Sequence, residues 1–133
     1  MALKFFVPEE LDVESKTMFE RHVKAFLDLL VLALLEDKPR CGYDILATIH
    51  RRFNILLSPG TLYPLLYALE KQGFIKSQAH NRKKDYVISE KGSNTLKRLS
   101  RDFKNSTLNL LSVMNEDFSA NSSLIDENLA IKT

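Results

Sequence analysis

The sequence predicts a mainly α-helical fold with a small β-hairpin. Apolar residues recur at helical spacing in four separate segments, and a pair of short β-type stretches lies between the third and the fourth. The chain has 133 residues, 44% of them hydrophobic, which is enough to form the core of one domain. The order helix, helix, helix, hairpin, long helix is that of a winged helix-turn-helix with an added C-terminal dimerisation helix.

The first predicted helix spans residues 19–36, a segment without Gly or Pro. Its apolar residues lie nearly all round the helix, so it must be covered on nearly every side. We expect its own domain to cover one part and a second subunit to cover the rest. The acidic residues 1–18 are interpreted as an N-terminal arm or a loosely attached helix.

Two helices follow. The second runs from Gly42 to Phe53 with one apolar stripe. The third starts at Ser58-Pro59, where Ser is a good N-cap and Pro fits the first helical position, and it ends near Gly73.

The hairpin and the last helix complete the domain. Phe74-Ile75 begins one strand, residues 80–84 form a polar tip, and residues 86–88 form the second strand. We therefore assign residues 19–92 to the winged helix-turn-helix, 93–116 to a C-terminal dimerisation helix and 117–133 to a flexible tail. The residues expected at the dimer interface are apolar positions of the first and last helices: Phe26, Leu30, Leu34, Leu96, Leu99, Phe103, Leu110 and Val113.

The third helix has two different faces. One carries four leucines at helical spacing, Leu62, Leu65, Leu66 and Leu69, and should pack on the first two helices. The opposite face carries Gly60, Tyr63, Pro64, Tyr67 and Lys71. An ordinary solvated face would carry Glu, Lys and Gln, so this composition indicates a binding surface.

The chemistry of that face suits a polyanion. Free N–H groups in the first turn and the positive end of the helix dipole favour a phosphate. The hydroxyls of Thr61, Tyr63 and Tyr67 can reach phosphates or base edges. Pro64 costs about 3 kcal/mol inside a helix, which favours a role other than stability. The alternative is that Pro64 lies near the first turn, where the cost is lower.

Charge is distributed unevenly along the chain. Residues 40–104 contain 13 Lys/Arg against 5 Asp/Glu, although the whole chain has a net charge of only +2. Arg82, Lys83 and Lys84 concentrate positive charge at the hairpin tip. A basic middle is typical of a surface that binds polyanions, and the alternative is a solvated basic surface without a partner.

Several motifs resemble the PadR family of transcriptional regulators. They are Gly42-Tyr43-Asp44-Ile45, residues 57–66 with the sequence LSPGTLYPLL, Leu69-Glu70, Gly73-Phe74-Ile75 and Ser89-Glu90-Lys91-Gly92. The resemblance covers roughly residues 26–100. It implies a homodimeric repressor that places the third helix in the major groove and uses the hairpin as a wing, with the first and last helices at the dimer interface.

The sequence departs from the family at three points, one of which is the acidic N-terminal arm of residues 1–18, for which no counterpart in the family is recognised. Asp85 precedes Tyr86 in the second strand, where members usually have a pair of tyrosines, so an acid lies beside the basic tip. The chain has no Trp, so the stacking of flat aromatic drugs between tryptophans that some members show does not carry over.

No catalytic or metal-binding constellation is found. His22, His50 and His80 lie on different elements without metal-ligand spacing, and Cys41, the single cysteine, is interpreted as a small buried or half-buried apolar residue. We expect no enzymatic activity, no metal and no cofactor. No signal peptide is recognised and the longest apolar run is far below the ~18 residues that span a bilayer. The sequence therefore predicts a cytoplasmic protein that does not bind membranes.

The resulting hypothesis is a symmetric dimer that reads a palindromic operator in double-stranded DNA. Ser58, Gly60, Thr61, Tyr63, Pro64, Tyr67 and Lys71 would form the surface in the major groove. Tyr43, Arg82, Lys83 and Lys84 would contact phosphates. The alternative is a winged-helix module that binds a protein and no DNA. An effector, a small molecule or a protein, stays open.

Overall fold

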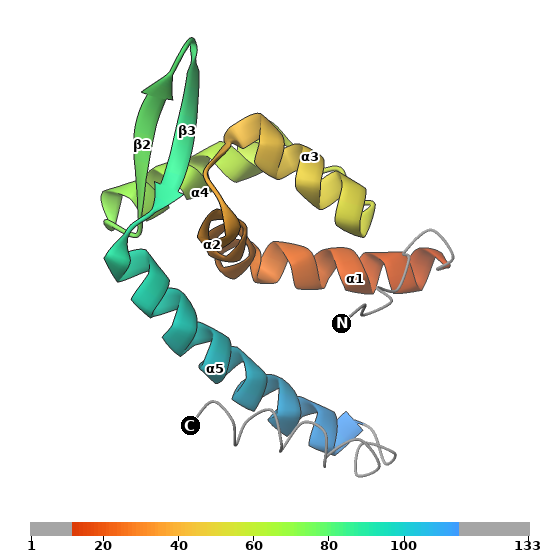
Figure 1. The fold of residues 1–133 in the computed structure, drawn as a ribbon. Coiled ribbons are helices and arrows are strands. Elements are labelled where there is room, and N and C mark those ends of the chain that lie inside the picture. Colours follow the sequence, from red (N-terminus) through yellow and green to blue (C-terminus); the bar gives the residue numbers. More distant parts are fainter. Residues whose placement is uncertain (1–11, 115–133) are drawn as a thin grey trace. The chain divides into compact units, whose positions relative to one another are not determined.

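The computed structural model describes residues 12–114, which form five helices and a three-stranded sheet (Figure 1). The elements in chain order are α1 (Val13–Ala25), α2 (Leu27–Asp37), β1 (Arg40–Cys41), α3 (Gly42–Phe53), α4 (Pro59–Lys71), β2 (Ile75–His80), β3 (Lys83–Ile88) and α5 (Glu90–Met114). The predicted fold class is confirmed: α2, α3 and α4 form the helical part, and β2 and β3 form the wing. The expected tail at 117–133 lies outside the described residues.

The single first helix predicted for residues 19–36 is wrong. Helix α1 begins at Val13, because the side chain of Asp12 accepts a hydrogen bond of 2.8 Å from the Ser15 N–H and caps the first turn. Phe26 then leaves helical geometry at φ −115° and separates α1 from α2. The break lets Val23 and Leu27 both reach the core, where each is at most 5% exposed.

The sheet contains one strand more than the predicted hairpin. Its order is β1-β3-β2, and Arg40 lies opposite Tyr86. The Arg40 side chain fixes this short strand to the helices: Nε donates to the Leu34 carbonyl at 3.1 Å and a terminal nitrogen lies 3.0 Å from the Asp37 carboxylate. No sequence pattern predicts β1, since two residues are too few to show alternation.

The core lies under α4. Leu62 and Leu66 are fully buried and Leu69 is 4% exposed, while Leu65 packs against the cluster from its edge. Ile45 and Ile49 of α3 are also fully buried. The predicted apolar stripe of the third helix is therefore confirmed, and so is the interpretation of Cys41 as a buried residue.

The helix α5 starts from a tight junction with the end of α4. Gly73 takes a positive φ of 81°, as a residue after a helix end often does. Ser89 Oγ donates to the Gly73 carbonyl at 2.6 Å and accepts from the Gly92 N–H at 3.0 Å. Only glycine fits at position 92, because a Cβ there would collide with the backbone carbonyl of Phe74.

The chain divides into two compact units, residues 1–97 and 98–133. The first holds the sheet, the core and α1 to α4. The described part of the second is the remainder of α5. No helix in the described residues 12–114 is both long and apolar enough to cross a membrane.

The junction at Gly92 generates the first prediction. Gly92→Ala should destabilise the fold by about 1–3 kcal/mol, because the new methyl group collides with backbone that cannot move aside cheaply. Asn94→Ala, at an exposed position of the same turn, is the matched control and should change stability little. Urea unfolding of both variants measures the effect. A Gly92→Ala variant as stable as the control would contradict the close packing described here.

Candidate nucleic-acid interface

Helix α4 begins with a complete cap. Ser58 Oγ accepts from the Thr61 N–H at 3.2 Å and lies 3.0 Å from the Thr61 hydroxyl. Pro59 has no N–H at the first helical position. The first turn of α4 therefore offers a ligand fewer free backbone N–H groups than the sequence indicated. Among the described residues of that turn, Pro59 has no N–H, Thr61 and Leu62 donate to Ser58, and the Gly60 N–H remains.

The outward face of α4 is exposed as predicted. Tyr63 is 45% exposed and Tyr67 is 67% exposed. Gly60, Pro64 and Lys71 are exposed beside them. Pro64 is a true interior residue, since α4 continues to Lys71 after it. Pro64 is the sixth residue of α4, in the turn that follows the first, so the alternative that it lies near the first turn stays open.

Tyr63 leans toward α3. A Cβ on Gly42 would collide with the end of the Tyr63 ring, so the absence of a side chain at Gly42 leaves the room that this ring occupies. The ring borders a shallow notch of about 270 Å³. Its lining comes from four separate elements, β1, α3, α4 and β3: Cys41, Gly42, Tyr43, Tyr63, Lys83, Lys84 and Tyr86. Local sequence patterns could not show this notch, because it exists only after α3, α4 and β3 have packed together.

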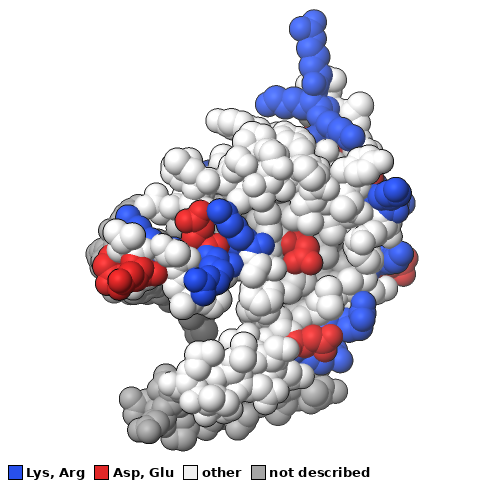
Figure 2. Space-filling view, turned by 180° about the vertical axis from the view of Figure 1, so that it is seen from behind, with Lys and Arg blue, Asp and Glu red and all other residues white. Residues whose placement is uncertain are grey.

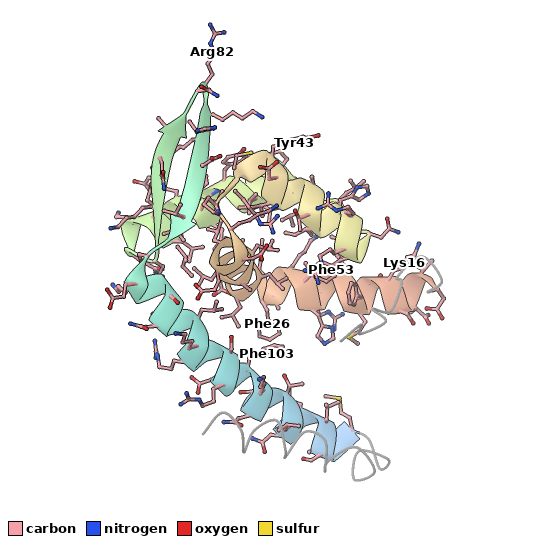
Figure 3. The ribbon with its side chains drawn as sticks, viewed as in Figure 1. Lys16, Phe26, Tyr43, Phe53, Arg82 and Phe103 are labelled. Carbon is pink, nitrogen blue, oxygen red and sulfur yellow. The ribbon has the colours of Figure 1, made fainter. Side chains whose placement is uncertain are left out.

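Tyr43 lies at the rim of the notch. It is 73% exposed in the first turn of α3, where Figure 3 shows it pointing out from the helix. The structure thus brings Tyr43 of α3 and Tyr63 of α4 to the same notch as Lys83 and Lys84 of β3, although Tyr43 and Lys83 are 40 residues apart in sequence.

The three basic residues of the hairpin do not act as one cluster. Arg82 stands at the tip and points away from the body (Figure 3), and Figure 2 shows the basic side chains as a projection there. Lys84 instead lies 3.8 Å from the Glu70 carboxylate of α4 and 5.6 Å from the centre of the Tyr86 ring. An exposed ion pair stabilises little, but this one draws the Lys84 side chain, which lies opposite Ala79 next to the tip, toward α4.

Tyr86 joins the wing to α4. It is 6% exposed, and burial raises the pKa of its hydroxyl above 10.0, with further contributions from Glu70 and Tyr63. Tyr86 lies opposite Ser77 of β2, so the neutral phenol belongs to the base of the hairpin.

The predicted interface residues for a dimer fall into two groups. Leu30, Leu34 and Leu96 are half-buried and pack against the chain's own core, and Phe26 is 38% exposed. In the second unit, Leu99 and Phe103 are half-buried, whereas Leu110 is 59% exposed and Val113 is 86% exposed. Whether any of them meets a second subunit stays a prediction.

Among the residues 12–114 that the structure describes, no group of three His, Cys, Asp or Glu side chains is arranged to hold a metal ion. The chemistry of the exposed site is that of hydroxyls, ammonium and guanidinium groups.

This arrangement of helices and hairpin is the winged-helix fold. The chain belongs to the PadR-like family of transcriptional regulators, whose model matches residues 31–98. That family is not a class of enzymes.

Curated relatives are similar to this chain in sequence, and solved structures share its fold. The transcriptional activator GvpE of Haloferax mediterranei is 36% identical over 75 residues, which are 56% of this chain and 39% of GvpE. The chain spans about two fifths of the length of the curated relatives it matches. A transcriptional regulator from Clostridium thermocellum is 24% identical, with a TM-score of 0.63 over 72% of this chain and 93% of that one.

A second solved structure with a similar fold is described as a winged-helix protein. F93 from STIV, a winged-helix DNA-binding protein, is 23% identical, with a TM-score of 0.53 over 62% of this chain and 89% of F93.

The raised pKa of Tyr86 generates a prediction about pH. A phenol that holds its proton more tightly in the folded state stabilises the fold below pH about 10, and this contribution is lost as the pH rises above that value. Tyr86→Phe should therefore flatten the fall in unfolding free energy at alkaline pH, whereas the exposed Tyr67→Phe should not. Urea unfolding between neutral and alkaline pH compares them. Equal alkaline slopes in the two variants would contradict the assignment.

Proposed function

We propose that this protein binds a palindromic operator in duplex DNA as a homodimer and represses transcription there. The observation that carries the proposal is the outward face of α4, an exposed helical surface with Gly60, Tyr63, Tyr67 and Lys71 and no acidic residue among them. A helix fits the major groove, and such a surface allows its backbone to approach the bases closely.

We assign different roles to the two tyrosines because they differ in exposure and in neighbours. Tyr67, the more exposed of them, is assigned to base edges together with Thr61. Tyr63 borders the notch with Tyr43 and Lys83, so we assign its hydroxyl to a backbone phosphate. Ser58 supports this surface as the cap of α4, and Lys71 adds a cation at its other end.

The wing adds phosphate contacts. Arg82 and Lys83 at the tip are exposed and reach the backbone or the adjacent minor groove in this proposal. Lys84 contributes less than the other two, because Glu70 already neutralises part of its charge.

Dimerisation is supported by the apolar residues at the end of α5. Leu110, Val113 and Met114 are at least 59% exposed and share one side of the helix by their spacing of three and four. A symmetric dimer would cover them and would place two α4 helices about 34 Å apart, one turn of DNA.

Repression is the simplest outcome of such binding, because a dimer that occupies a promoter excludes polymerase without a further contact. The GvpE relatives are named activators, so the two directions compete. A reporter gene behind the operator separates them. We place the protein in the cytoplasm, where a bacterial or archaeal chromosome lies.

The wing generates the test of DNA binding. Replacing Arg82 and Lys83 with Ala in both subunits of the dimer should lower the slope of log affinity against log salt concentration by about 3.6 in magnitude, because each of the four lost phosphate contacts contributes about 0.9. The control replaces two exposed lysines away from the interface, Lys38 and Lys97, and removes the same charge.

Fluorescence anisotropy with an operator duplex at several salt concentrations measures both slopes. The proposal predicts a reduced slope for the wing variant alone. Equal slopes for the two variants would remove the wing from the interface, and a wild-type affinity that does not depend on salt would favour the protein-binding module.

A further inference from the structure

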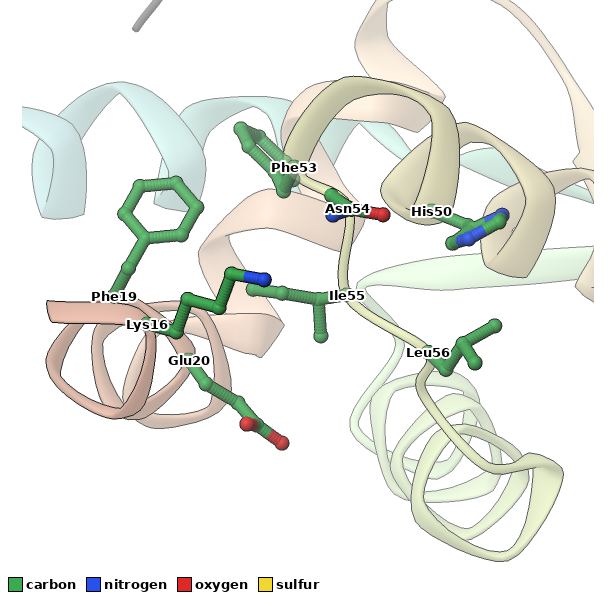
Figure 4. A pocket seen from close by; sticks show the side chains of 8 residues that line it. All are labelled: Lys16, Phe19, Glu20, His50, Phe53, Asn54, Ile55 and Leu56. Atoms are coloured by element: carbon green, nitrogen blue, oxygen red, sulfur yellow. The ribbon is translucent and has the colours of Figure 1, made fainter. Parts of the chain in front are cut away.

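A second concave site shares no residue with the notch at Tyr63. It opens between α1, the end of α3 and the linker of residues 54–58 that leads to α4 (Figure 4). Its volume is about 270 Å³. Its lining is half apolar and half polar: Phe19, Phe53, Ile55, Leu56, Lys16, Glu20, His50 and Asn54.

The apolar part of the pocket comes from two helices and the linker. The ring centres of Phe19 and Phe53 lie 5.8 Å apart, and both side chains are half-buried. Ile55 is buried at 7% exposure, whereas the next residue, Leu56, is 81% exposed. One exposed leucine is ordinary on a protein surface. Here it borders the same hollow as two partly exposed rings, so a further apolar side chain placed there would cover all three.

A positive charge lies across this apolar wall. Lys16 extends over the pocket with its ammonium toward Asn54 and Ile55 (Figure 4), and the part of the chain that the structure describes contains no ion pair for it. Glu20, the acidic residue of the lining, already lies 2.9 Å from Lys24. The pocket therefore suits an apolar group with an acidic group beside it.

The sequence that precedes α1 carries these two kinds of group. Residues 3–7 have the sequence LKFFV, and Pro8 separates them from Glu9 and Glu10. Residues 1–11 lie outside the described residues, which begin at Asp12, the N-cap of α1. Two adjacent phenylalanines gain free energy when they leave water, because a buried aromatic side chain removes about 150–250 Å² from solvent.

The distance along the chain allows these residues to reach the pocket. Phe19 follows Asp12 by seven residues, about 10 Å along α1 at a rise of about 1.5 Å per residue. Phe6 precedes Asp12 by six residues, which span up to about 20 Å when extended. The chain has to reverse direction in between, and Pro8 suits such a turn. A short tether gives an effective concentration of about millimolar, so a weak contact is enough.

We propose that residues 3–7 dock in this pocket of their own chain and that the acidic pair after Pro8 contacts Lys16. The rings of Phe5 and Phe6 then cover Leu56 and the exposed edges of the pocket. Docking ties the N-terminal residues to the linker between Asn54 and Ser58, which positions the start of α4. This contact does not depend on DNA binding.

The direct test is an NOE measurement by NMR on the full chain. With uniformly 13C-labelled protein we expect NOEs between the ring protons of Phe5 or Phe6 and the methyl groups of Ile55 or Leu56. A sample mixed from labelled and unlabelled chains, recorded with an isotope filter, shows contacts between two chains alone, and there we expect none at the pocket.

Two NMR outcomes contradict the proposal. Contacts that appear in the filtered spectrum would assign the pocket to the N-terminal residues of a second copy. An absence of contacts between residues 3–7 and the pocket in both samples would leave the pocket to another molecule.

A double-mutant cycle measures the same contact by urea unfolding at one protein concentration. Leu56→Ser should raise the unfolding equilibrium constant about fivefold, because the covered leucine is lost. In a chain that already carries Phe5→Ser and Phe6→Ser, the same change should have almost no effect, because no cover is left to lose. Additive effects of the two changes would overturn the docking.

Controls come from the N-terminal residues and from a distant exposed position. Lys4→Ser alters the segment without removing an apolar side chain and should leave the effect of Leu56→Ser unchanged. Val113→Ser, at a residue 86% exposed in α5, should show no coupling to Phe5 and Phe6 whatever its own effect.

The charge contact has its own cycle. Lys16→Glu should raise the unfolding constant severalfold by repelling the acidic pair, and Glu9→Lys with Glu10→Lys in the same chain should restore it at low salt. A failure of this rescue would remove the ion contact, and the NOE measurement would still decide whether the apolar residues dock.

Discussion

The packing of Leu62 and Leu66 against the core determines which face of α4 points to solvent. Both side chains are fully buried, next to Ile45 and Ile49 of α3. Burying one leucine stabilises the fold by about 1.5–3 kcal/mol, so this stripe cannot rotate outward without a large loss. Because side chains on a helix keep fixed angles to one another, the same stripe forces Gly60, Tyr63 and Tyr67 to the surface. The exposed face is thus a consequence of the core.

A second constraint fixes the wing relative to α4. The short strand β1, held by Arg40, adds an edge to the hairpin, and Tyr86 is buried at the base of β3. The ion pair of Lys84 and Glu70 connects β3 to α4 one ladder position from the tip pair of His80 and Lys83. The tip with Arg82 and Lys83 therefore extends from a hairpin whose lower part is packed against the rest of the domain. A positioned pair of cations loses less freedom on meeting a phosphate than a disordered loop would.

Much of the fold followed from local sequence patterns. The leucine stripe, the Ser58-Pro59 start, the Gly73 end and the strands around residues 80–84 all depend on neighbours within a few residues, and each was predicted. The break at Phe26 and the strand at Arg40 were missed, because they are decided by what α1 and β3 bury and by hydrogen bonds to distant residues. The same holds for the site. Exposure of Tyr63 and Tyr67 follows from spacing, but the notch that joins Tyr43 to Lys83 and the pairing of Lys84 with Glu70 need the assembled fold.

The central claim is that the protein binds DNA as a symmetric dimer and that the outward face of α4 in each subunit contacts the bases of one half-site. Selection of genomic fragments by the purified protein, followed by footprinting of the enriched site with wild type and Tyr67→Ala, tests it most directly. The account predicts a palindrome whose half-sites are centred about one helical turn apart, and a loss of sequence preference in the variant. An absence of any enriched sequence, or a footprint that Tyr67→Ala leaves unchanged, would contradict it.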